Sequence, residues 1–318
     1  MLPIEQIKKI EIELSSYCNA RCPLCDRQYL GTDIERSDFN KGHLSFDNVK
    51  ALIEQLPNPK DVVLYFAGVG GDPMMNPEIV EIFEYCSKKM KWVVLDTNAS
   101  LRSVDTWKEL GKISAEYGSC INFSIDGLSD TNYLYRIRTE WGKIIENATT
   151  YIKHGGYAVW KYIVFEHNQH QVEEAKEYSK QLGFKDFMYE NSVRHYDTVG
   201  PLQPMPPNNS NEKKNRLFSN NVSAYSIQCK ALQKSMLYVS NDFKLFPCCY
   251  FAGWKIKDPI FFSKYFTLNN SLKERTLEDI LGDSFFDRLK DDWESLSPHL
   301  CKKTCNQTKY WEREKHIE

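Results

Sequence analysis

The most constraining feature of this sequence is a regular alternation of strand-like and helix-like segments from residue 6 to about residue 191. Six short segments rich in β-branched and aromatic residues predict β-strands, and turn residues bound most of them. Helical patterns lie between them, which is typical of an α/β fold with a parallel sheet. The expected strands are 7–15, 61–67, 92–97, 120–126, 158–165 and 184–190, and the expected helices are 45–56, 77–90, 103–117, 131–154 and 169–182.

Signals at the helix ends agree with these boundaries. Pro77 is suited to a first helical turn, and Gly155 and Gly183 are placed to end helices. Because crossovers between parallel strands are right-handed, successive crossovers curl the sheet toward a barrel. Six strands are fewer than the eight of a closed barrel. The sequence therefore predicts a partial (β/α)6 TIM-like barrel, with loops of functional interest at the carboxyl ends of its strands.

The alternation ends near residue 200, where the composition changes. Residues 200–216 are rich in Pro and Asn, which is typical of a linker. Segment 235–251 predicts a β-hairpin that turns at Asn241-Asp242, and segment 276–293 predicts a helix capped by Thr276 and Asp279. We therefore expect a partial-barrel domain (1–199), a linker (200–220) and a small C-terminal domain containing the hairpin and the helix (221–318).

Charge and hydropathy argue against several classes of partner. The net charge is −2 and the pI is about 6.4, so no basic excess is present to neutralise a nucleic-acid backbone. No apolar run approaches the length of a membrane span. The N-terminus lacks the basic and apolar regions of a signal peptide. A cytoplasmic protein with no nucleic-acid and no membrane partner is the expectation.

Ten cysteines require an explanation in such a chain. A reducing cytosol keeps thiols free, so clustered cysteines indicate metal or redox chemistry rather than disulfides. We expect two isolated ones, Cys86 and Cys120, to belong to the core. The others form an N-terminal triplet and a C-terminal group of five: Cys18, Cys22, Cys25, Cys229, Cys248, Cys249, Cys301 and Cys305.

The triplet has the spacing Cys-x3-Cys-x2-Cys and directly follows the first expected strand. It therefore belongs to the first loop at the carboxyl end of the sheet. Three thiolates can hold three corners of a [4Fe–4S] cluster and leave one iron with an open coordination site. Chemistry at a metal centre requires such an open position. A structural zinc site or a surface group of thiols is the alternative.

The triplet resembles the cysteine motif of the radical S-adenosylmethionine (radical SAM) enzymes. The resemblance implies that S-adenosylmethionine (SAM) binds the open iron through its amino and carboxylate groups. Reductive cleavage then gives methionine and a 5′-deoxyadenosyl radical. Residues 68–77 (GVGGDPMMNP) resemble the Gly-Gly-Glu-Pro stretch of the family. In the family, the main chain of that stretch contacts the SAM amino group. The resemblance implies the same role for Gly70, Gly71 and Asp72, and Asp72 stands where the family usually has Glu.

Further segments extend the resemblance over residues 7 to about 190. Asn98 lies in LDTNAS (95–100), Ser124 in INFSIDG (121–127) would reach the ribose or carboxylate of SAM, and Arg136 would pair with the carboxylate. Each has an ordinary alternative as a turn, a strand residue or a surface charge, and their order supports them only together. Position alone makes further residues candidates for the pocket or the barrel mouth: Tyr17, Tyr29, Asp126, His167 and His195.

The C-terminal cysteines resemble the twitch or SPASM extension of the family, which carries auxiliary iron–sulfur clusters. LFPCCYF (245–251) matches the Pro-Cys-Cys of the extension, whereas CKKTC (301–305) departs from its final Cys-x2-Cys. The resemblance implies one auxiliary [4Fe–4S] cluster and leaves Cys249 over. Two alternatives remain. Cys249 could be the ligand in place of Cys248, or the four cysteines could bind a structural zinc ion in place of the cluster. The expected ligands are Cys229, Cys248, Cys301 and Cys305.

A fully ligated auxiliary cluster would serve electron transfer. It could oxidise a substrate radical, which implies an oxidoreductase that dehydrogenates a small polar metabolite. Cys249 could instead return a hydrogen atom, which implies epimerisation, although simple burial is its ordinary explanation. An electron donor of the flavodoxin or ferredoxin type is expected.

Three other functions remain open at the level of the sequence. The short segment before the first strand leaves no room for a leader-peptide-binding domain, so modification of a peptide or protein ranks second. RNA modification ranks third because of the charge balance. A non-catalytic metal-binding or electron-carrier protein is the alternative of another class, although such a protein would need neither the glycine stretch nor Arg136.

Overall fold

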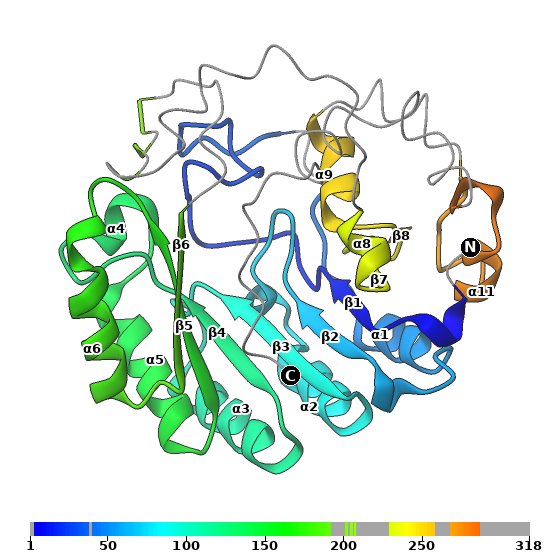
Figure 1. Ribbon diagram of the computed structural model, residues 1–318, viewed down its shortest axis with the longest axis horizontal. Helices are drawn as coiled ribbons and strands as arrows, with labels where there is room; N and C mark the ends of the chain where they lie inside the picture. The colour runs from blue at the N-terminus through cyan, green and yellow to red at the C-terminus, as the bar shows by residue number, and fades with distance from the viewer. Residues whose placement is uncertain are drawn as a thin grey trace.

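A computed structural model gives the fold of the chain (Figure 1). The structure describes residues 3–37, 40–191, 201–202, 204–205, 207, 229–257 and 268–286. Of the expected site residues, Cys301, Cys305 and His195 lie outside these ranges, as does most of the expected linker.

One curved sheet of eight strands organises the molecule, in the order β6-β5-β4-β3-β2-β1-β7-β8. All described neighbours pair in parallel except β7 and β8, which are antiparallel. The six strands expected from the sequence are present and form the partial barrel, which confirms the α/β fold. The strands are β1 (Lys9–Ile12), β2 (Val63–Phe66), β3 (Trp92–Thr97), β4 (Cys120–Ser124), β5 (Tyr157–Val164), β6 (Asp186–Asn191), β7 (Met236–Val239) and β8 (Leu245–Phe246).

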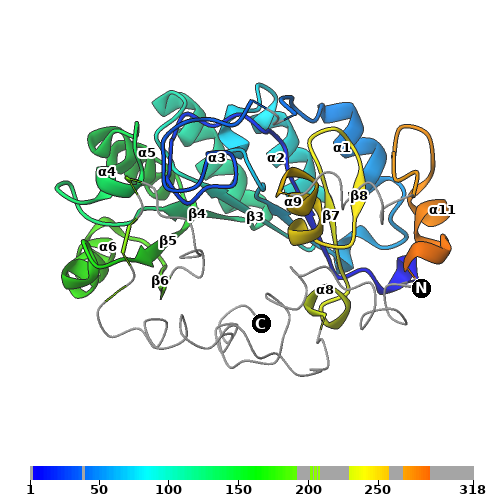
Figure 2. The ribbon, with the colours of Figure 1, turned by 90° about the horizontal axis from the view of Figure 1, so that it is seen from above.

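Helices pack along the outer side of this sheet (Figures 1 and 2). Apolar side chains on alternate strand positions, such as Ile10, Leu64, Leu95 and Phe123, are fully buried beneath them. The helices are α1 (Phe46–Ile53), α2 (Ile79–Lys89), α3 (Val104–Tyr117), α4 (Asn132–Tyr135), α5 (Trp141–Lys153) and α6 (Val172–Leu182), with short 3-10 turns η1 (Ile4–Gln6), η2 (Pro59–Asp61), η3 (Pro73–Met75) and η4 (Gln169–Gln171).

Two of the expected helices differ from the sequence prediction. The single helix expected at 131–154 is two helices, α4 and α5, because the backbone of residues 136–140 leaves the helical path, with Arg138 at φ +68°. Pro77 precedes α2 rather than forming its first turn. The expected stops are confirmed: Gly183 ends α6 in the left-handed region, and Gly155 at φ +89° follows the end of α5.

The expected hairpin is confirmed, and it extends the main sheet. β7 pairs in parallel with β1, with Ile12 opposite Val239, and β8 turns back along β7. Helices α8 (Lys230–Gln233) and α9 (Cys249–Lys257) flank the hairpin in sequence. The Thr276 side chain caps α11 (Leu277–Leu281) as predicted. This helix ends before Gly282, residues 284–286 are helical again, and residues 287–293 of the expected helix lie outside the described residues. The division of the chain into two domains and a linker stays a prediction.

Within the described residues, no helix combines the length and apolar character that crossing a membrane requires.

The side chain of Asn76 forms hydrogen bonds with three separate segments of the chain, and its substitution tests their contribution to the stability of the fold. Its fully buried amide donates to the carbonyls of Leu14 (2.8 Å) and Leu44 (2.7 Å) and accepts from Glu78 N (2.9 Å). Asn76→Ala removes the described donor to the buried Leu44 carbonyl and one of the two donors to the Leu14 carbonyl, which keeps its bond from Leu44 N, so we expect the free energy of unfolding to fall by about 1–3 kcal/mol. Urea unfolding followed by circular dichroism measures this loss. The exposed Asn58→Ala is the control and should change little, and equal stability of both variants would contradict this account.

Candidate active site

The glycine loop (residues 68–72) after β2 lies directly against the segment that leads from β1 to the cysteine triplet. The amide of Asp72 donates to the carbonyl of Tyr17 at 2.8 Å. A Cβ atom on Gly71 would lie 1.5 Å from the carbonyl oxygen of Ser15, so only glycine fits there. The two loops that the resemblance assigns to cluster and SAM therefore form one packed unit.

Asp72 has a structural role that the sequence left uncertain. Its buried carboxylate accepts from Met74 N (2.9 Å), from Asn98 N and Nδ2 (both 2.8 Å), and from the Thr97 hydroxyl (2.9 Å). These bonds join the end of β2 to the end of β3. Burial raises the pKa of Asp72, and the bonds from Asn98 and Met74 oppose that shift. The side chain is thus engaged by protein donors, and contacts to a ligand would fall to the main chain.

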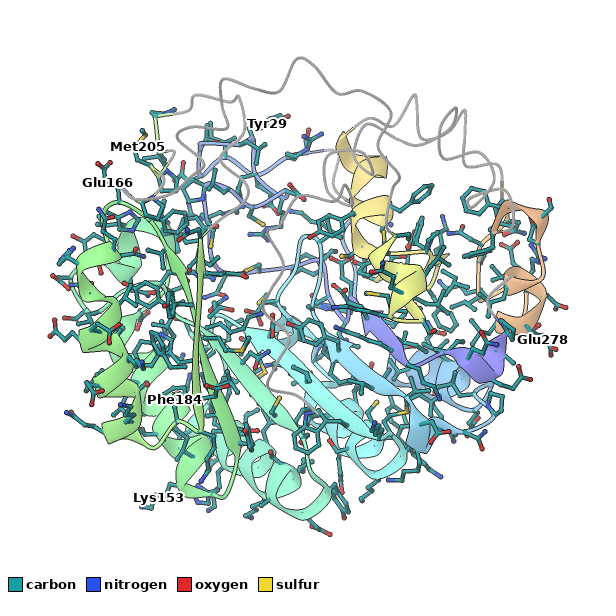
Figure 3. The ribbon with its side chains drawn as sticks, viewed as in Figure 1. Tyr29, Lys153, Glu166, Phe184, Met205 and Glu278 are labelled. Carbon is teal, nitrogen blue, oxygen red and sulfur yellow. The ribbon has the colours of Figure 1, made fainter. Side chains whose placement is uncertain are left out.

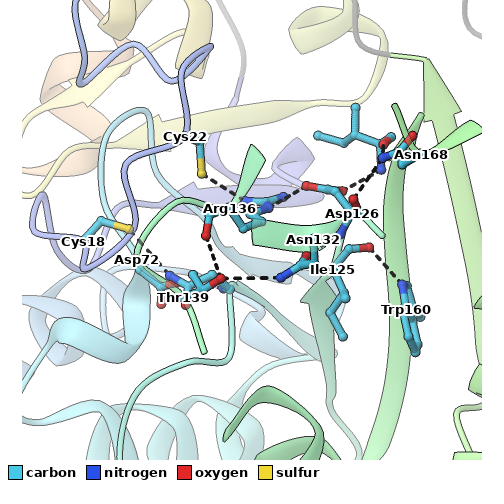
Figure 4. A network of polar contacts seen from close by, with 12 residues as sticks. Cys18, Cys22, Asp72, Ile125, Asp126, Asn132, Arg136, Thr139, Trp160 and Asn168 are labelled. Atoms are coloured by element: carbon cyan, nitrogen blue, oxygen red, sulfur yellow. Dashed lines mark hydrogen bonds and ion pairs between the residues drawn. The ribbon is translucent and has the colours of Figure 1, made fainter. Parts of the chain in front are cut away.

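The three cysteines occupy the loop after β1, as predicted from their position directly after the first expected strand. Cys22 is buried, whereas Cys18 and Cys25 are partly exposed. The Asn98 amide lies 3.6 Å from Cys18 Sγ, and an Arg136 guanidinium nitrogen lies 3.8 Å from Cys22 Sγ (Figure 4). Donors at these positions stabilise negative charge on sulfur.

Arg136 is held in this position by a buried carboxylate. Its Nε lies 2.5 Å from Asp126 Oδ2, and Asp126 is fully buried between β4 and β5 (Figure 4). Asp126 Oδ1 also accepts from Ile163 N at 2.6 Å. Burial raises the pKa of Asp126 and the charge of Arg136 opposes this, whereas the Asp126 carboxylate raises the pKa of Arg136. Arg136 is therefore a fixed cation facing the triplet.

The donor set fits an iron–sulfur cluster. Burial raises the pKa of Cys22 to about 11 and that of Cys18 further, so these two thiols are protonated near neutral pH. Binding of iron would displace these protons, as metal binding to cysteine generally does. Within the described residues, no three His, Cys, Asp or Glu side chains converge on one ion position. Three soft sulfur donors in one loop, with N–H donors beside them, suit the corners of a cubane cluster.

The other residues expected from the sequence lie in varied surroundings. Ser124 ends β4 opposite Lys161 and is half-buried. Tyr17 packs on His43 with ring centroids 4.9 Å apart. Tyr29 is 49% exposed, at a rim of the molecule that Figure 3 shows, and is not part of the network around Arg136. His167 stacks on Phe165 at 5.3 Å, and burial lowers its pKa.

A polar cluster on the inner face of the sheet was missed by sequence reasoning. Asp96 on β3 accepts from the Tyr65 hydroxyl (2.7 Å), from Lys161 Nζ (2.8 Å) and from Asn122 Nδ2 (2.6 Å). Lys161 Nζ also lies 3.1 Å from the Tyr65 oxygen. Parallel strands are usually apolar on both faces. The signal was present in the sequence, because each strand alternates apolar residues with these polar ones.

Cys229, Cys248 and Cys249 lie next to the β7–β8 hairpin. Cys229 precedes α8. Cys248 precedes α9, and its sulfur accepts from Phe251 N at 3.4 Å. The Cys249 thiol faces the Glu11 carboxylate on β1, at the inner face of the sheet, and lowers its pKa against the larger effect of burial. The two adjacent thiols therefore have different surroundings.

The sequence matches a family model and several curated proteins. The model of the Radical SAM superfamily matches residues 12–186, which is more than half of the chain. Fe-coproporphyrin III synthase of Methanosarcina barkeri is 29% identical over 119 residues, 37% of this chain and 27% of the relative. AdoMet-dependent heme synthase of Nitratidesulfovibrio vulgaris is 30% identical over 94 residues, 30% of this chain and 23% of the relative. The chain thus spans about a quarter of the length of these relatives.

Solved structures share the fold. Streptococcus suis SuiB bound to S-adenosylmethionine superposes with a TM-score of 0.60 at 16% identity, covering 93% of this chain and 71% of that chain. Native anSMEcpe with bound AdoMet superposes with a TM-score of 0.57 at 14% identity, covering 88% of this chain and 82% of that chain. At this level of identity, the similarity establishes the fold.

Asp72 provides a test of the site's construction. Asp72→Asn keeps the shape but replaces one acceptor oxygen by an NH₂ group that faces the donors of Thr97 and Asn98. We expect the free energy of unfolding to fall by roughly 2–3 kcal/mol, because buried donors lose their acceptor. Thermal and urea unfolding measure the loss. The exposed Asp61→Asn serves as control, and a stability equal to wild type in Asp72→Asn would show that these bonds contribute little.

Proposed function

The chain belongs to the radical SAM superfamily, and on that premise we propose that it binds a [4Fe–4S] cluster through Cys18, Cys22 and Cys25 and uses SAM for radical chemistry on a polar substrate. When bound, the cluster supplies the electron that cleaves SAM to methionine and a 5′-deoxyadenosyl radical, which abstracts a hydrogen atom from the substrate. The protein binds, orients and shields the reactants.

One observation carries this proposal: the triplet, the glycine loop and Arg136 meet at one end of the sheet. Arg136 and Asn98 place N–H groups beside the sulfurs of Cys22 and Cys18. A protein that only stored metal or carried electrons would need no cation fixed by a buried carboxylate at this point. The arrangement favours a cluster with a co-substrate beside it.

Different residues around the triplet would bind different chemical groups of SAM. The main chain of Gly70, Gly71 and Asp72 would take the amino group, because the Asp72 side chain is engaged elsewhere. Arg136 would take the carboxylate, since a guanidinium presents several donors in one plane. Ser124, at the end of β4, would reach the ribose or the carboxylate.

The inner face of the sheet supports a substrate that carries polar groups. Lys161 stays cationic there because the Asp96 carboxylate raises its pKa against the effect of burial. Glu11 adds a carboxyl whose pKa burial raises. Side chains that offer both charges in a partly buried setting suit a small polar metabolite with donors and acceptors of its own.

The C-terminal thiols support a second redox centre. We propose that Cys229, Cys248, Cys301 and Cys305 hold an auxiliary [4Fe–4S] cluster that accepts an electron from the substrate radical. The position of Cys248 before α9 suits a thiolate, since a helix N-terminus stabilises negative charge. Cys249 faces Glu11 on the inner side and is the candidate hydrogen-atom donor if the reaction is an epimerisation.

A peptide substrate is the second candidate. Tyr29, Ile34, Leu202 and Met205 are exposed apolar residues, and Leu202 N bonds Gly31 O at 2.9 Å, so these segments adjoin (Figure 3). An apolar rim near the triplet loop suits a longer substrate. Structures of the same fold hold the precursor peptide SuiA and a Cp18Cys peptide. Two relatives are named for the synthesis of Fe-coproporphyrin III and of heme, so iron porphyrins of this kind join the compounds that require testing.

Iron counting tests the two-cluster proposal. Anaerobic reconstitution of the whole chain should yield about eight irons, and replacement of Cys18, Cys22 and Cys25 by Ala should leave about four. The wild type should form 5′-deoxyadenosine from SAM with dithionite, and so should the matched control Cys86→Ala, which replaces a buried core thiol, whereas the triple variant should form none. Uptake of zinc alone, or absence of 5′-deoxyadenosine from the wild type, would contradict the proposal.

Substitution of Lys161 tests whether the inner face of the sheet binds the substrate. Small polar metabolites, short peptides and Fe-coproporphyrin III should be screened for stimulation of 5′-deoxyadenosine formation. We expect Lys161→Met to lower the stimulated rate about 10- to 100-fold, because a charged hydrogen bond is lost. The unstimulated rate and the iron content should stay unchanged. Equal stimulation in Lys161→Met and in the exposed control Lys108→Met would place substrate recognition elsewhere.

A further inference from the structure

Glu13 lies where the glycine loop, β1 and the β7–β8 hairpin meet. It directly follows β1 and is 4% exposed. Its carboxylate oxygen Oε1 accepts from Gly70 N at 3.0 Å, and its own amide donates to Val239 O, at the end of β7, at 2.9 Å. One residue therefore bonds both the loop after β2 and the strand that precedes the hairpin turn.

The glycine loop packs directly on the Glu13 side chain. A Cβ atom on Gly68 would lie 2.8 Å from Glu13 Oε1 and 2.9 Å from its Cγ. A side chain at position 68 would therefore have to displace the Glu13 carboxylate. Because N–H and C=O point in opposite directions across a trans peptide, the bond from Gly70 N also turns the Val69 carbonyl away from Glu13. Without this bond, a loop with three glycines would have many backbone conformations open to it.

The C-terminal elements enclose the same loop from the other side. The buried side chain of Tyr238 on β7 faces both the Glu13 carboxylate and the backbone of Val69. Among the described residues, the Tyr238 hydroxyl has no partner in good hydrogen-bond geometry, so it acts on Glu13 as a nearby dipole. A Cβ atom on Gly253 of α9 would lie 3.2 Å from Val69 Cγ1. The loop is therefore held between Glu13 and the hairpin region.

We propose that Glu13 is a positioning residue that fixes the glycine loop in the conformation that binds the SAM amino group and couples this loop to the β7–β8 hairpin. The inference rests on the proposed function, because that function assigns SAM to the loop. It adds a residue that contacts neither cluster nor SAM and acts through Gly70. It also links the affinity for SAM to the C-terminal part that holds Cys248 and Cys249.

The charge state of Glu13 gives the proposal a pH signature. The pKa of Glu13 is raised to about 7, and burial is the largest cause. The Gly70 amide and Tyr238 act to lower this pKa, and the negative charge of Asp242 in the hairpin turn acts to raise it. Glu11, on the same strand, also faces Tyr238. A carboxylate is a stronger acceptor than a neutral acid. The loop should therefore be held more tightly above pH 7 and less tightly below it.

The contribution of Glu13 to overall stability changes with pH in the opposite direction. A carboxyl whose pKa is raised on folding binds protons more tightly in the folded state than in the unfolded state. The unfolding free energy contributed by Glu13 is therefore lost as pH rises from about 4.5 to about 7. Tighter SAM binding at high pH thus cannot be explained by the contribution of Glu13 to the stability of the protein.

The test measures the SAM dissociation constant on anaerobically reconstituted holoenzyme without reductant, by equilibrium dialysis from pH 6 to 8.5. At pH 8 we expect Glu13→Gln to bind SAM about 3- to 10-fold more weakly, because the acceptor loses its charge, and Glu13→Ala to bind more weakly still. The SAM amino group titrates near pH 8 in every variant, so the ratio of the dissociation constant of Glu13→Gln to that of wild type isolates the effect of Glu13. This ratio should fall toward one below pH 7.

Three comparisons keep the outcome clear. The exposed Glu173→Gln should match wild type, and iron content should be equal in all variants. Hydrogen exchange of residues 66–75 in Glu13→Ala should be faster than in wild type. Asp242→Asn should move the midpoint of the pH dependence below that of wild type, because a negative charge facing Glu13 is removed.

The results separate failure of the inference from failure of the proposed function. Wild type that binds no SAM would overturn the proposed function. Wild type that binds SAM, with Glu13→Gln and Glu13→Ala binding equally well and exchanging equally slowly, would overturn the positioning role of Glu13 alone. An unchanged midpoint in Asp242→Asn would overturn the coupling to the hairpin.

Discussion

The in-register parallel pairing of β1 to β5 is the constraint on which the candidate site depends. Ile12 pairs with Phe66 and Phe66 with Leu95, so the loops after β1, β2 and β3 leave the sheet at one level. Cys22 and Arg136, separated by 114 positions in the sequence, thereby come within 3.8 Å of each other. A register slip of one residue would turn every side chain of a strand to the opposite face and dissolve this arrangement.

Because of this register, the two faces of the sheet carry different kinds of side chain and have different roles. The outer face is apolar and buried under helices, and it supplies the hydrophobic stabilisation of the fold. The inner face carries Asp96, Lys161 and Tyr65, which are costly to bury unless they are paired. Their mutual bonds satisfy them and hold them in fixed positions. A polar surface that is already ordered loses little conformational entropy when it binds a substrate. The inner face is therefore suited to substrate recognition, although burial of its polar groups costs free energy.

The sequence was most informative where local pattern and tertiary structure agree. Runs of β-branched residues predicted the first six strands, and the position of the cysteines directly after the first strand placed the triplet at the carboxyl end of the sheet. The break between α4 and α5 was not predicted, because no glycine or proline lies in residues 136–140, where Arg138 adopts a positive φ and Arg136 bonds Asp126. The bonds to the Asp72 carboxylate were not predicted because its partners Thr97 and Asn98 lie at the end of another strand. Propensity cannot report such non-local bonds.

The position of β7 was also beyond local pattern, and it changes how the C-terminal region relates to the site. The sequence predicted a hairpin but not its partner, because pairing with β1 joins segments more than 200 residues apart. β1 is thereby paired on both sides, so the strand that leads into the triplet has no open edge in the described sheet. Glu13 stands at the end of that strand and bonds residues of both neighbours. Any change that shifts the hairpin must therefore act on β1 and the glycine loop together, since the three share one hydrogen-bonded ladder and one buried carboxylate.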